Sequence, residues 1–188
     1  MLRIVNLEEI QEMLLRLPGV VSGLERREAG FAAVVREWLV ETEKVLVSNR
    51  LAAAGEVATL RGALISAERG AVPAGVSVEG RATPRKVRDA TAADVLRKAE
   101  SAVSAAVRAD AARVGEAERL VYQVVSVAVR KGVLPPPPDS GSHTEVLRAA
   151  WALVSDDPDT GAAATHVVGL VGPHDALVLL DRALVATA

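Results

Sequence analysis

The side chains best suited to acid–base or metal chemistry in this chain are three histidines, and their spacing forms no recognised motif. His143, His166 and His174 all lie near the C-terminal end of the sequence. A zinc site needs about three converging nitrogen, oxygen or sulfur ligands, but the sequence contains no His-x-x-x-His or Glu-x-x-His pair. We therefore predict surface or helix-capping histidines, with no catalytic residues and no metal site.

A short acidic segment offers the oxygen ligands that calcium prefers. It contains Asp156, Asp157 and Asp159, which are followed by Gly161. An EF-hand loop also needs a distal glutamate, and Val168 occupies that position. The segment is therefore predicted to be a turn with a helix cap. The glycine-rich motifs that bind nucleotides are absent, and no cofactor is predicted.

One basic cluster has the chemistry to contact phosphate groups. Arg81, Arg85, Lys86 and Arg88 surround a predicted helix start at Thr83-Pro84. Cations at a helix N-terminus oppose the helix dipole, so this cluster does not serve local stability. A solvated helix face is the simpler interpretation. The alternative is a helical subunit of a nucleoprotein complex that contacts phosphates through these residues.

The composition limits the possible classes of protein. The chain has 188 residues, half of them hydrophobic, so it can bury a sizeable core. Its formal net charge of −2 gives no general attraction to polyanions. Without cysteine it has no disulfide and no cysteine-ligated cluster. The sequence has neither a transmembrane-length apolar run nor a signal-peptide pattern, so the expected location is the cytoplasm, with no membrane contact.

Two long segments have the apolar spacing of amphipathic helices. Between Ser22 and Arg69 there is no proline, and apolar residues recur at steps of three and four. A continuous helix is one prediction for this segment, and a break at Ser48–Arg50 or at Gly55 is the other.

The second long segment runs from Pro84 to about Lys131 with the same spacing. Its valine-rich part, Leu120–Val129, has the propensity of a strand. The absence of a turn signal before Gly132 favours a helix there.

These patterns predict an all-α fold with a long, bundle-like antiparallel helical hairpin and a small C-terminal group of short helices. The expected organisation is a helical bundle over 1–134, a proline-rich linker over 135–142 and a helical subdomain over 143–188. The linker contains four consecutive prolines, which are extended and semi-rigid.

Two long helices cannot both bury their apolar stripes against each other alone. Either the C-terminal helices fold back over the exposed side or another copy of the chain covers it, and an uncovered stripe is a partner surface. We therefore predict a non-enzymatic structural or assembly protein. It would self-associate, or dock to another protein, through its long helices as a subunit of a larger particle or complex. The predicted interface residues are Phe31, Trp38, Val45, Leu60, Leu64, Leu96, Val103 and Val107.

Overall fold

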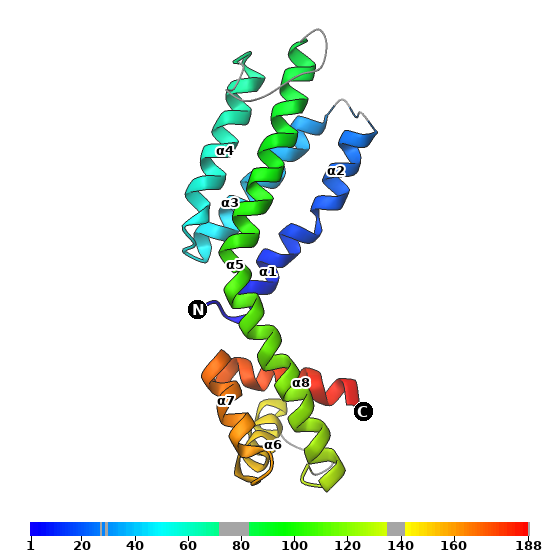
Figure 1. Cartoon of the computed structure of the whole chain (residues 1–188), viewed down its shortest axis with the longest axis vertical. Helices are drawn as coiled ribbons and strands as arrows, with labels where there is room; N and C mark the ends of the chain where they lie inside the picture. Colours follow the sequence, from blue (N-terminus) through cyan, green and yellow to red (C-terminus); the bar gives the residue numbers. More distant parts are fainter. Residues whose placement is uncertain (27, 29, 72–82, 135–141, 188) are drawn as a thin grey trace. The chain divides into compact units, whose positions relative to one another are not determined.

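The computed structural model describes residues 1–26, 28, 30–71, 83–134 and 142–187, and it confirms the all-α fold. The described residues form eight helices and no strand (Figure 1). Three short helices follow the proline-rich segment, as predicted. The helices are α1 Ile4–Leu15, α2 Leu17–Glu25, α3 Phe31–Ser48, α4 Ala53–Glu68, α5 Pro84–Lys131, α6 His143–Asp156, α7 Gly161–Val171 and α8 Pro173–Thr187.

The chain forms two compact units that divide within α5. The N-terminal unit comprises Leu2 and Ile4–Arg108, and the C-terminal unit comprises Met1, Arg3 and Ala109–Ala188. No residue between Val107 and Ala117 is buried, so the apolar stripe of α5 is covered in two separate stretches. This division differs from the linker predicted at 135–142, of which only Ser142 is among the described residues.

The first predicted long helix is two helices, α3 and α4. Of the two predicted break positions, the structure has the break at Ser48–Arg50. Arg50 takes a left-handed conformation with φ 56°, and the N–H of Leu51 donates a hydrogen bond to the carbonyl of Leu46. This pattern closes the C-terminus of a helix. Ser22, where the first long segment begins, lies inside α2 and does not start a helix.

Helices α3 and α4 form an antiparallel hairpin. Arg36 pairs with Glu68 at 2.9 Å, and Glu43 pairs with Arg61 at 2.7 Å. Residue numbers rise by seven along α3 while they fall by seven along α4, which requires opposite directions. The hairpin in the described residues is therefore shorter than the predicted one and lies wholly within the N-terminal unit.

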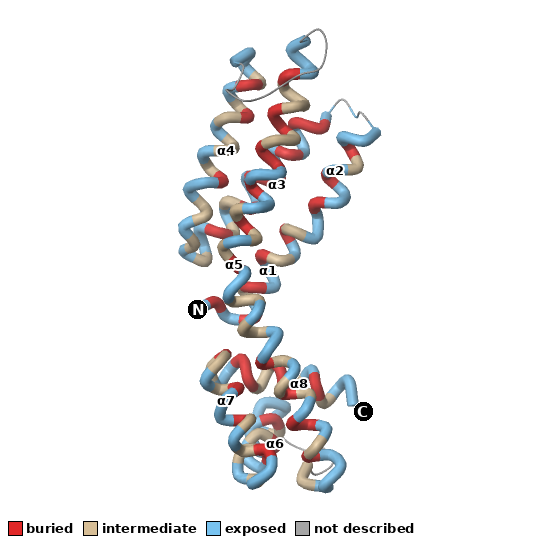
Figure 2. Tube along the Cα trace, viewed as in Figure 1, coloured by how far each residue is buried: buried red, intermediate tan, exposed pale blue. Residues whose placement is uncertain are grey.

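Trp38 fixes α3 against α1 in the core of the N-terminal unit. Its indole Nε1 donates a buried hydrogen bond of 2.8 Å to the carbonyl of Met13. That carbonyl lies in the last turn of α1, where carbonyls lack a helical N–H partner. Trp38 therefore satisfies a helix end while its ring fills the core. Figure 2 shows buried residues recurring along α3 and α5, as expected for helices that cover one apolar face.

The C-terminal unit packs α6, α7 and α8 with the second half of α5. Leu120–Val129 is helical, as the missing turn signal predicted. A capping box of Ser142 and Glu145 begins α6, which the sequence also predicts. Arg113 of α5 donates a hydrogen bond to the carbonyl of Leu170 in the last turn of α7, where a cation also complements the helix dipole.

Lys131, the last residue of α5, holds the turn between α6 and α7. Its Nζ lies 2.7 Å from carboxylate oxygens of both Asp157 and Asp159. The hydrogen bond from Lys131 is the main reason that the pKa of Asp157 lies below its ordinary value. The acidic segment therefore forms the predicted turn, and the cation that its carboxylates bind is the side chain of Lys131.

Replacing Asp157 with Asn should lower the melting temperature at neutral pH, because it removes the charge that Lys131 pairs with. In the folded chain, the hydrogen bond from Lys131 stabilises the charged carboxylate of Asp157. The contribution of this carboxylate to stability is therefore present above its ordinary pKa of 3.8. It is lost as the pH falls through the lowered folded value. The difference between the thermal melts of the two proteins should therefore be constant at neutral pH and shrink progressively as the pH falls from about 4 to 3. A difference that persists unchanged at the acid end would contradict this account.

Two glycines of α7 should respond oppositely to alanine. A Cβ at Gly161 would overlap the carbonyl oxygen of Ser155, so the turn must shift. Gly169 is exposed and has open space at that position. We expect Gly161→Ala to destabilise the chain by about 1–3 kcal/mol. Gly169→Ala should stabilise it by about 0.4–1 kcal/mol. Urea denaturation measures both, and changes of the same sign would show that the turn geometry is wrong.

Candidate functional site

Most of the predicted interface residues lie in the core of their own chain. The folded chain itself therefore covers most of the predicted stripes, and self-association through these residues stays a prediction. The spacing identified the apolar face of each helix but not what packs on it. Val45 and Leu60 are half-buried, and the buried residues are Phe31, Trp38, Leu64, Leu96, Val103 and Val107.

A groove of about 200 Å³ remains open at the edge of the N-terminal core. One wall is α2, which presents Leu17, Val21 and Leu24 at the i, i+4, i+7 spacing of one helix face. The other wall is α5, which contributes Ala93 and Leu96. The ring of Phe31, at the start of α3, also lines the groove.

The walls of the groove combine a small residue on α5 with a helix start on α2 that has no side-chain cap. Ala93 is the smallest apolar residue in the lining. Pro18 lies in the first turn of α2, and no side chain caps that end of the helix. Val21 is 39% exposed and Leu24 is 36% exposed, although both are aliphatic. Two aliphatic side chains therefore face water beside an unfilled apolar groove.

The rim of this groove carries one cation, Arg97, and one anion, Glu100, and both belong to α5. Arg97 pairs with Asp94 at 2.9 Å, and Lys98 binds the second oxygen of Asp94 at 2.7 Å. The hydrogen bond from Lys98, ahead of that from Arg97, lowers the pKa of Asp94. Glu100, one turn after Arg97, has no ion pair with any residue that the structure describes. The rim is therefore close to neutral, with an available carboxylate.

The sequence pattern does not reveal this groove, because Pro18-Gly19 is compatible both with the end of a helix and with a bend in one. Proline is tolerated in the first turn of a helix, where its missing N–H has no partner to lose. The signal that could have found the groove is the apolar i, i+4, i+7 spacing of Leu17, Val21 and Leu24.

The basic cluster is partly neutralised by its own helix. Arg85 and Arg88 lie 3.5 Å and 3.9 Å from carboxylate oxygens of Asp89. The Thr83 hydroxyl accepts a hydrogen bond from the backbone N–H of Lys86 at 3.3 Å, so Thr83 caps α5 as predicted. Arg81 lies outside the described residues.

The three histidines are exposed and lie on different helices or helix ends. His143 Nε2 is 2.9 Å from Asp181, and His166 Nε2 is 3.6 Å from Glu116. No group of three histidine or acidic residues in the described parts of the chain is close enough to hold a metal ion. The structure therefore brings together none of the side chains considered for metal or acid–base chemistry, beyond these two pairs.

Comparisons with known proteins add no family. No protein-family description, curated protein or solved structure matches the chain. No single helix of the described residues is long and apolar enough to cross a membrane. Only α7 and α8 taken together reach that length and composition, and they are bent by 119° relative to each other.

Proposed function

We propose that this chain is a non-enzymatic assembly protein that self-associates through the groove between α2 and α5. The observation that carries the proposal is the unfilled apolar groove beside the exposed Val21 and Leu24. Burying these side chains removes apolar area from water, which favours association by roughly 25 cal/mol per Å² before the entropy cost of binding.

A second copy of this chain fits the groove better than an unrelated partner does. A two-fold interface uses the same patch on both copies, so the patch must complement itself. This patch offers both a hollow, lined by Phe31 and Leu96, and protruding aliphatic side chains, Val21 and Leu24. The net charge of −2 also causes little repulsion between copies.

The rim charges support the same occupant. Arg97 and Glu100 lie one turn apart on the same face of α5. A two-fold axis that sets the two α5 segments antiparallel would bring Arg97 of each copy toward Glu100 of the other. Such a rim pair contributes little affinity but selects the orientation of the two copies.

Leu24→Asp and Val21→Asp should each convert a multimer into a 19.6 kDa monomer, because a carboxylate would then be buried in the interface. Both side chains are more than a third exposed, so the monomer should remain folded. Light scattering after size exclusion measures the mass, and circular dichroism checks the helix content.

Val40→Asp and Val47→Asp are the matched controls, because these α3 residues are 48% and 60% exposed and do not line the groove. They should leave the multimer intact. A wild-type chain that remains monomeric at high concentration would refute self-association, and equal dissociation by the controls would refute the groove as its site.

A charge exchange tests the orientation separately. Arg97→Glu and Glu100→Arg should each weaken the multimer, because each sets like charges against one another across the two-fold axis. The double variant should restore it. Single variants without effect, or a double variant that adds their losses, would rule out the antiparallel pairing.

The alternative function, a nucleoprotein subunit that contacts phosphates through Arg81, Arg85, Lys86 and Arg88, has less support. Asp89 lies within ion-pair distance of two of these cations and reduces the local positive charge. Nuclease treatment before light scattering separates the two functions, since only a nucleoprotein would change mass.

A further inference from the structure

A second surface, in the C-terminal unit, has a different chemistry from the groove. A shallow hollow of about 450 Å³ lies along α5. Among the described residues, its lining belongs to α5, at the i, i+3, i+4 steps of one helix face: Arg119, Tyr122, Gln123, Ser126, Val127 and Arg130.

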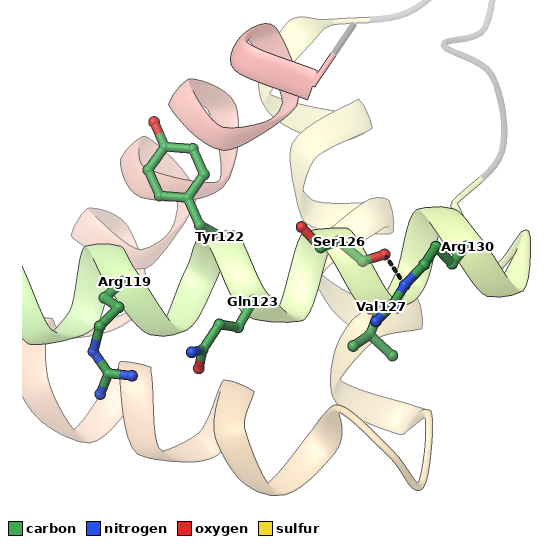
Figure 3. A pocket seen from close by; sticks show the side chains of 6 residues that line it. All are labelled: Arg119, Tyr122, Gln123, Ser126, Val127 and Arg130. Atoms are coloured by element: carbon green, nitrogen blue, oxygen red, sulfur yellow. Dashed lines mark hydrogen bonds between the residues drawn. The ribbon is translucent and has the colours of Figure 1, made fainter.

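Much of the hydrogen-bonding capacity of this face is unused within the described residues. Arg119, Tyr122 and Gln123 make no side-chain hydrogen bond or ion pair there. Arg130 Nε donates one hydrogen bond of 3.3 Å to the carbonyl of Ser126, which leaves its other N–H groups available. Figure 3 shows Arg119 and Gln123 reaching to one side of α5 and Tyr122 to the other. The face is therefore bordered by polar groups and is not filled by them.

The charge of this face is opposite to that of the unit to which it belongs. Among the described residues, its lining holds two arginines and no acidic residue. Over 109–188, by contrast, acidic residues outnumber lysines and arginines. Tyrosine and arginine are also the residue types that contribute most often to binding energy at protein interfaces.

We propose that this face binds an acidic amphipathic helix of a partner protein. Arg119 and Arg130 are eleven residues, or three turns, apart on α5, which separates them by about 16 Å along the axis. A partner helix laid along α5, with two carboxylates three turns apart, meets both guanidinium groups. Aliphatic residues between those carboxylates contact the Tyr122 ring and Val127, which is the general mode of helix-in-groove recognition.

A nucleic acid is a poorer occupant of the same face. Two cations neutralise few phosphates, which gives a polyanion little affinity. The face also has apolar groups, Val127 and the Tyr122 ring, where a phosphate backbone would lie. The proposal is independent of self-association through the N-terminal unit.

The test uses the full chain and a synthetic, fluorescently labelled helical peptide. The peptide carries two glutamates three turns apart and two leucines between them on the same face. Fluorescence anisotropy should show saturable binding that weakens with salt. Arg119→Glu and Arg130→Glu should each weaken binding by about tenfold or more, since each replaces a charge-assisted contact with repulsion.

Two controls keep this test specific to the face. Arg148→Glu changes an exposed arginine on α6 of the same unit and should leave binding unchanged. A peptide with glutamine in place of both glutamates should bind much more weakly. Absence of saturable binding, or equal loss in the Arg148→Glu variant, would overturn the proposal. Tighter binding of a single-stranded oligonucleotide would assign the face to nucleic acid instead.

Discussion

The apolar stripe of α5 is the constraint on which both units depend. Val95, Val103 and Val107 are buried in the N-terminal unit, and Val121 and Val125 are buried in the C-terminal unit. Burying one such side chain contributes about 1.5 kcal/mol or more. Helices α1 to α4 therefore cover the first half of α5, and helices α6 to α8 cover its second half. Each core lacks a buried helix face if its half of α5 is removed.

The start and end of α5 could be predicted because the signals are local. Thr83 caps the helix, Pro84 opens it and Gly132 ends it with a positive φ. Which helices pack on the apolar stripe of α5 could not be predicted, because periodicity identifies the apolar face of a helix but not the element that packs against it. Leu64 and Val103 illustrate this point. Their spacing is equally compatible with an interface between copies and with a core, and the folded chain buries them itself.

The candidate groove depends on a property that sequence patterns describe poorly, namely how closely two helices approach. Ala93 on α5 faces an α2 that contains Pro18 and two glycines, Gly19 and Gly23. Each glycine lowers helix propensity by about 1 kcal/mol relative to alanine. Helix α2 is therefore the weaker wall of the groove, and it is the wall expected to adjust when the groove is occupied.

The charges of the two surfaces favour different partners for the two proposed contacts. A two-fold contact places each residue near its own counterpart or a neighbour of it, so a charged face that self-associates is favoured when it holds both signs of charge. The groove rim meets this condition with Arg97 and Glu100. The α5 face of the C-terminal unit does not, because its described lining contains Arg119 and Arg130 but no carboxylate, so two copies in contact there would bring like charges together. Like charges across an interface cost several kcal/mol, which suppresses that pairing. Self-association and capture of an acidic partner can therefore occur on one chain without competing for the same surface.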